Sequence, residues 1–242
     1  MMKRGKVSVC MTTYNGEKYI RPQLDSILKQ LSIDDEVIIS DDSSTDNTIN
    51  IIKSYNDERI KLYESCFHNY IKNFEFSLKQ ASGEYIFLSD QDDVWMDNKV
   101  EIMLEALSKS DLVCSNCKVV DKDLNIISNA FWADALSQRS GFLKNLHHNH
   151  YLGCCMAFKN NVLQLVIPFP HNLITHDGWI GLVAEVFCKT MFIDDKLILY
   201  RRHGQNTSNT TEGSTLDIFQ KIEYRGIIMM GLIKIMIKNQ KR

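Results

Sequence analysis

The sequence predicts an α/β protein with a mainly parallel sheet, flanking helices and a C-terminal amphipathic helix. In the first half of the chain, short runs rich in β-branched residues alternate with helical patterns, which is typical of parallel βαβ units. Polar and acidic clusters follow the first, second and fourth of these runs. Ligands of open α/β sheets bind at the carboxyl ends of the strands, so these clusters predict a functional site at that edge.

The spacing of apolar residues defines the elements of the first half. Strands are expected over Val7–Thr12, Glu36–Ser40, Ile60–Tyr63 and Tyr85–Leu88. Apolar residues recur every three or four positions in four other stretches, which predicts helices over Tyr19–Leu31, Ile49–Tyr55, Phe74–Ala81 and Asn98–Leu107. The second helix has three candidate N-caps, which are Ser43, Ser44 and Thr45.

The second half of the chain is less regular. Strands are expected over Asp111–Val120, Gly153–Phe158 and Lys196–Tyr200, and a helix over His176–Phe187. A polar loop follows from Arg201 to Gly213, and the last helix begins near Thr215. Since no repeat or low-complexity linker divides the chain, we expect one domain over residues 1–214 and a helical tail over residues 215–242.

Composition excludes several classes of protein. The 242 residues carry a net charge of −2, and this balance lacks the basic excess of a nucleic-acid-binding protein. No window reaches the roughly 18 apolar residues of a membrane span, and the run Val7–Met11 is too short for a signal peptide. The seven cysteines are odd in number and irregularly spaced, which favours reduced thiols. We therefore expect a cytoplasmic protein without a nucleic-acid partner.

Two acidic clusters are the candidate functional residues. Asp90, Asp92 and Asp93 lie within four residues after a hydrophobic strand, and such crowding is tolerated when a cation neutralises it or water surrounds it. Mg²⁺ typically takes one or two carboxylates plus substrate phosphates. Asp41 and Asp42 end the second strand candidate, where a carboxylate can accept a hydrogen bond from a base or sugar hydroxyl. A solvated turn and a helix cap are the alternative interpretations.

Three segments together resemble a known family. They are Thr12-Thr13-Tyr14-Asn15-Gly16, Asp41-Asp42-Ser43-Ser44-Thr45-Asp46-Asn47-Thr48 and Phe87-Leu88-Ser89-Asp90-Gln91-Asp92-Asp93-Val94-Trp95. In this order, and each at a strand end, they resemble the nucleotide-binding half of family 2 glycosyltransferases, which have the GT-A (Rossmann-like) fold. The resemblance implies a nucleotide-binding half over residues 1–110 and an acceptor-side half over residues 111–214.

Later segments extend the resemblance to about Asn209. Gly153-Cys154 is similar to a glycine element on the acceptor side, and His176-Asp177-Gly178-Trp179 stands at the catalytic-base motif. That motif is usually Glu-Asp, so His176 is a departure whose role stays open. Tyr200-Arg201-Arg202-His203-Gly204-Gln205-Asn206 resembles the carboxyl-terminal histidine region of these enzymes. The chain looks most like bacterial rhamnosyltransferase-like enzymes of surface polysaccharide synthesis, and the Gln-x-x-Arg-Trp motif of processive synthases does not occur.

The resemblance implies an inverting, metal-dependent sugar transfer. The donor would be a UDP- or dTDP-linked sugar, and the acceptor a hydroxyl of a glycan or lipid-linked acceptor. Asp177 would be the general base, and Mn²⁺ or Mg²⁺ the cofactor. The remaining roles fall to two sets of residues: Thr13, Tyr14, Asp41, Asp42, Asp90 and Arg201 for the donor, and Asp92 and His203 for the metal.

Other interpretations remain open at this point. A metal-dependent sugar nucleotidyltransferase needs similar acidic loops, and a non-catalytic sugar-nucleotide binding protein would need only the donor residues. The His147, His148 and His150 group has no assigned role. The tail combines apolar residues with Lys and Arg, which is typical of helices that bind anionic membrane surfaces. It predicts a peripheral contact at the inner face of the cell membrane, with core packing or a dimer contact as alternatives.

Overall fold

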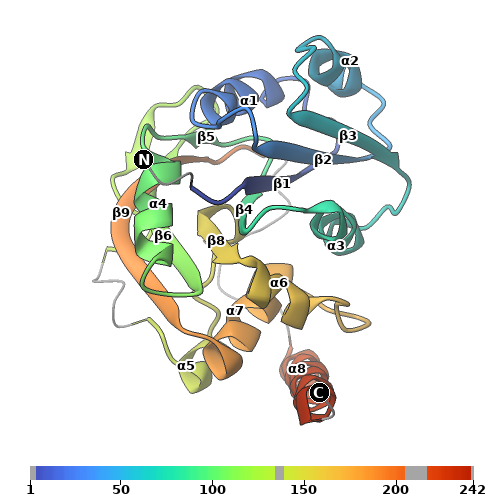
Figure 1. Cartoon of the computed structure of the whole chain (residues 1–242), viewed down its shortest axis with the longest axis vertical. Helices are drawn as coiled ribbons and strands as arrows, with labels where there is room; N and C mark the ends of the chain where they lie inside the picture. The colour runs from blue at the N-terminus through green and yellow to red at the C-terminus, as the bar shows by residue number, and fades with distance from the viewer. Residues whose placement is uncertain (1–3, 134–138, 205–216, 241–242) are drawn as a thin grey trace.

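The computed structural model describes residues 4–133, 139–204 and 217–240. A nine-stranded mixed sheet forms the centre of the molecule, and helices pack around it (Figure 1). The strand order is β3-β2-β1-β4-β8-β6-β9-β5, with β7 paired to β6. This architecture confirms the predicted fold class.

The first half of the chain builds the parallel part of the sheet. Its strands are β1 (Val7–Thr13), β2 (Glu36–Asp42), β3 (Ile60–Ser65) and β4 (Tyr85–Ser89). They are connected through helices α1 (Ile20–Leu28), α2 (Thr48–Lys53) and α3 (Tyr70–Gln80), and α4 (Lys99–Leu107) follows. All pairings among these four strands are parallel. The predicted βαβ units are therefore confirmed.

The register brings the predicted polar clusters to one edge. Thr13 pairs with Asp41 across β1 and β2, and Met11 pairs with Ser89 across β1 and β4. Strand β2 runs two residues beyond the expected Ser40, so Asp41 and Asp42 are the last residues of a strand. The three candidate N-caps of the second helix were wrong: Asn47 precedes α2, and its side chain makes no capping hydrogen bond.

The second half, together with β5 (Val94–Trp95) from the first half, adds the remaining strands of the sheet. The elements of the second half are β6 (Leu112–Val120), β7 (Ile126–Ser128), α5 (Phe142–His147), β8 (Met156–Lys159), α6 (Asn160–Val166), α7 (His176–Phe187) and β9 (Thr190–Arg201), and α8 (Ile218–Gln240) follows. Strand β8 is antiparallel to β4 and β6, while β9 is parallel to β6. The short elements β5, β7, α5 and α6 were not predicted, and Gly153–Cys155 forms a 3-10 turn where a strand was expected.

Strand β5 links the acidic segment of the first half to strand β9 of the second half. It pairs antiparallel with β9, with Val94 opposite Leu199 and Trp95 opposite Ile198. The acidic segment that precedes β5 is thereby placed beside the carboxyl end of β9. The start of helix α7 approaches the same region through the Gly153 turn, because a Cβ atom at Gly153 would lie 3.8 Å from Asp177 Cβ.

Two smaller expectations concern thiols and membrane spans. All seven cysteines are free, and five of them are buried. Within the described parts of the chain, no helix combines the length and apolar character needed to cross a bilayer. The proposed division into residues 1–214 and 215–242 stays a prediction.

Candidate active site

The loops after β1, β2 and β4 are joined into one preformed rim. The Tyr14 N–H donates to Gln91 Oε1 at 2.9 Å, and Gln91 Nε2 donates to the Tyr14 carbonyl at 3.0 Å. The Asn15 N–H donates to Ser44 Oγ, and the Thr45 N–H donates to Asn15 Oδ1, both at 2.8 Å. Because each loop is held by the next, the rim does not depend on a ligand for its shape.

Asp41 and Asp42 lie buried below this rim. Asp41 accepts hydrogen bonds from Thr13 Oγ1 at 2.7 Å and from Ser44 Oγ at 2.6 Å. Asp42 accepts from three consecutive backbone N–H groups, those of residues 67–69. Asp42 thus shapes the loop after β3, whereas Tyr14 is 56% exposed at the rim. The donor contacts expected of these residues stay predictions.

Asp92 and His203 meet although 111 residues separate them. His203 Nε2 lies 2.7 Å from Asp92 Oδ2, and both side chains are largely buried. The ring of Tyr19 stacks on the imidazole with centroids 4.6 Å apart and planes 19° from parallel. The imidazole is therefore held in a fixed orientation, with one nitrogen directed at the carboxylate. This is the pair that the sequence assigned to the metal.

Arg201 fastens the acidic segment to the end of β9. Its backbone N–H donates to Asp93 Oδ1 at 2.9 Å, and its Nε donates to the Asp92 carbonyl at 2.6 Å. Its guanidinium also donates to the Lys122 carbonyl and lies 4.9 Å from the Tyr19 ring centroid. The side chain is 4% exposed. These contacts give Arg201 a role in holding the loop, and its predicted contact with the donor is untested.

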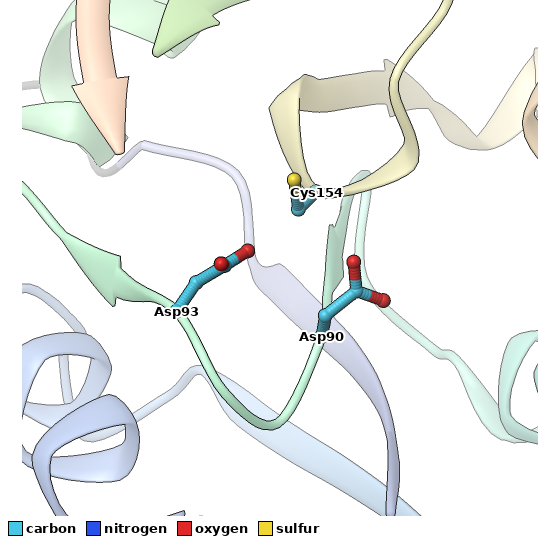
Figure 2. A group of neighbouring side chains, drawn as sticks. All are labelled: Asp90, Asp93 and Cys154. Carbon is cyan, nitrogen blue, oxygen red and sulfur yellow. The ribbon is translucent and has the colours of Figure 1, made fainter. Parts of the chain in front are cut away.

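Asp90, Asp93 and Cys154 form a crowded group beneath the loop (Figure 2). Each offers a ligand atom, and these atoms lie within 4.8 Å of one another. Burial, followed by the charges of Asp92 and Asp177, raises the pKa of Asp90. Burial and the two neighbouring carboxylates also raise the pKa of Asp93, whose Oδ2 has no hydrogen-bond partner among the described residues. Burial and crowding therefore disfavour the ionised forms of Asp90 and Asp93, and a cation bound here would favour them.

Asp177 occupies the first turn of α7, near this group. Thr175 is the N-cap residue of α7. Asp177 Oδ1 accepts a hydrogen bond from the N–H of the next residue, Gly178, at 2.7 Å. The pKa of Tyr70 is raised by the burial of Tyr70 and by the charge of Asp177. The charge of Asp177 also contributes to the raised pKa of Asp90. Asp177 therefore lies near the acidic group, and its role as the general base stays a prediction.

His176, whose role was open, is a packing residue in this structure. Its ring stacks on Phe74 with centroids 4.0 Å apart and planes 18° from parallel. Neither ring nitrogen has a hydrogen-bond partner among the described residues. Burial lowers the pKa of His176, and the Asp177 charge opposes this only in part. The imidazole is thus neutral near pH 7 and fills an apolar position behind the candidate base.

Comparison with known proteins identifies the family. Residues 8–166, more than half of the chain, match the family model described as "Glycosyl transferase family 2". The chain belongs to glycosyl transferase family 2. Among curated relatives of this family 2 protein, the UDP-Glc:alpha-D-GlcNAc-diphosphoundecaprenol beta-1,3-glucosyltransferase WfgD of Escherichia coli is 31% identical over 68% of this chain and 64% of the relative. The dTDP-rhamnosyl transferase RfbG of Shigella flexneri is 29% identical over 90% of this chain and 78% of the relative.

Solved structures confirm the GT-A fold. TarS 1–349 of S. aureus, in complex with UDP-GlcNAc, superposes with a TM-score of 0.69 at 20% identity, covering 93% of this chain and 66% of the TarS 1–349 chain. The mannosyltransferase PcManGT from Pyrobaculum calidifontis, in complex with GDP-Man and Mn²⁺, gives a TM-score of 0.64 at 17% identity, covering 97% of this chain and 74% of PcManGT. Our chain spans just under two thirds of the length of WfgD and of the TarS 1–349 chain.

Three residues that support the family 2 site were not identified from the sequence. Gln23 is fully buried, and its Nε2 donates to Ser89 Oγ and to the Asp90 carbonyl, both at 2.8 Å. Lys99 is also fully buried, and its Nζ donates to the Cys154 carbonyl at 2.8 Å. Tyr19 orients His203. Gln23 could have been noticed in the sequence, because it is the one amide on the apolar face of α1. Lys99 could not, because a lysine at the start of a helix is ordinarily exposed to solvent.

Proposed function

We propose that this chain is an inverting glycosyltransferase that moves a sugar from a UDP- or dTDP-linked donor to a hydroxyl of a glycan or lipid-linked acceptor. The observation that carries the proposal is the meeting of Asp92 and His203 beside Asp90 and Asp177 at the carboxyl edge of the sheet. The names of WfgD and RfbG support a UDP- or dTDP-sugar and a role in surface polysaccharide synthesis. WfgD's name also supports a lipid-linked acceptor.

The residues at this edge fit a divalent cation. A carboxylate and an imidazole already lie in contact, and burial beside two further carboxylates raises the pKa of Asp93, so a bound cation would favour its ionised form. Carboxylates suit Mg²⁺ and Mn²⁺ alike, whereas an imidazole ligand favours a transition metal, so Mn²⁺ fits the pair better. When bound, the ion offsets the charge that develops on the leaving diphosphate. The Mn²⁺ complex of PcManGT is consistent with this choice.

The donor residues divide into those that shape the site and those that face its opening. Thr13 and Asp41 hydrogen-bond to each other and set the floor for the base and ribose. Tyr14 is the exposed aromatic ring at the rim and would lie along the base. Asp42 acts through the loop after β3, and Arg201 through the backbone of the acidic segment. Asp90 would accept hydrogen bonds on the ribose side.

Asp177 is proposed to take the proton from the acceptor hydroxyl. Its carboxylate is partly exposed and makes only a local bond to the Gly178 N–H, so a lone pair remains for the acceptor. Attack from the side opposite the leaving diphosphate then inverts the anomeric carbon.

A two-step experiment tests this function. Nucleotide sugars are screened with Mn²⁺ by thermal shift, because a ligand that binds only the folded state raises the melting temperature. The stabilising donor is then incubated with lipid-linked and free glycan acceptors, and the product is analysed for anomeric configuration. We expect an inverted product. A retained configuration, or pyrophosphate release from a nucleoside triphosphate and a sugar phosphate, would contradict the proposal, and the latter would favour a nucleotidyltransferase.

The proposed location is the cytoplasm, with peripheral contact at the inner face of the cell membrane. A lipid-linked acceptor would be found there, and the exposed apolar residues of α8 would provide the contact.

A further inference from the structure

Helix α8 packs on the domain through one short stretch of its inner face. Ile228, Leu232 and Ile235 are buried there. At Gly231 the helix passes directly over Trp179 of α7, since a Cβ atom would lie 2.6 Å from the indole ring. Figure 1 shows the helix beside α6 and α7, outside the sheet and its flanking layers. The orientation of α8 is therefore set by packing, and so is the face that it turns outward.

The outward face is a continuous apolar stripe. Eight of its side chains are 42–78% exposed, and they recur every three or four residues along the helix: Ile218, Phe219, Ile222, Met229, Met230, Ile233, Met236 and Ile237. We call this set the outer stripe. Gly226 continues it, and no charged residue interrupts it. A second apolar face on a helix whose first face is already packed indicates a further apolar environment.

The charges beside the outer stripe indicate which environment this is. Arg225 borders the stripe on one side and Lys234 on the other, with Lys238 near the C-terminal end. Glu223, exposed on the same border as Lys234, is the only acidic residue within Ile218–Gln240, against four Lys and Arg residues. Apolar side chains bordered by cations match the boundary between acyl chains and anionic headgroups. Paired copies of this helix would instead bring the cations of two chains together.

Helix α8 also contacts the element that carries the candidate base. Tyr224 Oη lies 3.1 Å from Oγ1 of Thr175, the N-cap residue of α7. Arg225 Nε donates to the Leu146 carbonyl at 3.3 Å. The outer stripe is thus held at a set position relative to Asp177, two residues beyond Thr175. One helix diameter of about 10 Å separates the stripe from the helix face that meets α7.

We propose that the outer stripe of α8 binds an anionic membrane surface and thereby holds the start of α7, with Asp177, close to that surface. A hydroxyl attached to a membrane lipid would be presented there. The link to the acceptor rests on the proposed function. The membrane contact itself does not, because it follows from the stripe and its basic border.

Matched double variants test the contact without any turnover. Met229→Glu with Ile233→Glu places two charges in the outer stripe, and Gln220→Glu with Asn239→Glu adds the same charge at exposed positions outside it. Sedimentation with vesicles of phosphatidylglycerol and phosphatidylcholine measures binding, and light scattering measures mass. We expect the stripe variant to bind about tenfold or more weakly than the control variant, because its loss includes apolar burial as well as charge.

Each outcome bears on the proposal separately from the enzyme assay. Binding of wild type to anionic vesicles, with loss in the stripe variant and unchanged donor binding in both variants, supports it. Equal vesicle binding by the two variants would overturn it. A wild-type dimer that becomes monomeric in the stripe variant, without vesicle binding, would assign the stripe to a second copy of the chain. If vesicle binding follows the prediction but no sugar is transferred, only the proposed function fails.

Discussion

Carboxylates at the two ends of the central sheet have pKa values shifted in opposite directions. At the amino end of β2, Glu36 accepts from Lys6 Nζ at 2.9 Å, Lys61 Nζ at 2.5 Å and Ser8 Oγ at 2.5 Å. Burial alone would raise the pKa of Glu36, but these partners outweigh it and hold the pKa well below its usual range. The neighbouring Asp35, paired with Arg4, behaves in the same way.

At the carboxyl edge, burial and like charge act together. The pKa values of Asp90 and Asp93 are both raised, with Asp92 the strongest charged contributor in each case. The protein therefore stabilises the ionised form of Glu36 at the amino end, whereas it disfavours the ionised forms of Asp90 and Asp93 at the carboxyl edge. Carboxylates whose pKa is raised in this way concentrate at functional sites. The following predictions test that contrast, from the largest expected effect to the smallest.

Asp177→Asn should have the largest effect, and only on chemistry. Loss of a general base typically lowers a rate by about 10²–10⁴-fold, so kcat for transfer should fall within that range. Donor affinity should stay near wild type, and the melting temperature should fall by no more than about 2–4 °C, because a carboxylate in the first turn of a helix contributes only about 0.3–1 kcal/mol. Transfer at near wild-type rate, measured with a verified donor and acceptor, would reduce Asp177 to a residue that stabilises the first turn of α7.

Asp92→Asn should remove the metal-dependent part of activity. We expect turnover to fall by about 10²-fold or more, as it does when a preorganised electrostatic group is lost. Chelation of wild type with EDTA should have the same consequence, and Mn²⁺ should restore the rate. His203→Ala should cost less, because Asp92 and the diphosphate would still hold the ion. Full activity after exhaustive chelation would rule out the metal assignment.

Glu36→Gln should lower stability and leave chemistry alone. Removing one partner of a buried ion pair strands the other, but Lys6 and Lys61 are partly exposed, so we expect a loss of about 2 kcal/mol in the free energy of unfolding at pH 7. Urea denaturation measures it. Unchanged stability would mean that the ion pairs of Glu36 at the amino end of the sheet do not stabilise the fold.

The pH dependence of the stability difference between wild type and Glu36→Gln tests whether the pKa of Glu36 is lowered in the folded protein. The folded pKa of Glu36 lies below the unfolded value, so its stabilisation is fully present above about pH 4.3 and is lost as the pH falls toward the folded pKa. The stability difference between wild type and Glu36→Gln should therefore be constant from pH 7 to about pH 5 and shrink below pH 4. A difference that grew on acidification would contradict the lowered pKa.

Asp90→Asn should have the smallest effect, and it should raise the stability of the protein where Glu36→Gln lowers it. Without metal, removing one of the repelling carboxylates should raise the melting temperature by about 2–4 °C, the shift expected for ~1 kcal/mol in a chain of this size. Donor binding should weaken at the same time. A lower melting temperature without metal would show that the charges at the carboxyl edge are already compensated within the protein.

The sequence predicted the first half of the fold well and the second half only in outline. Strands β1 to β4 are apolar and bounded by polar loops, so their period and their ends were visible. The two-residue strand β5 carries no periodic signal, yet it places Asp92 beside His203. The acidic motif could be recognised from its residues, whereas the support from Tyr19 and Lys99 depends on tertiary contacts that local pattern does not encode.

Calorimetric titration of Mn²⁺ into the protein with UDP or dTDP present tests the contrast between the two ends most directly. Wild type and Glu36→Gln should each bind one Mn²⁺ with the same affinity, and Asp92→Asn should bind it at least about tenfold more weakly, in keeping with the loss of one charged ligand. Equal Mn²⁺ affinity in wild type and Asp92→Asn would contradict the assignment of the carboxyl edge as the metal and diphosphate site.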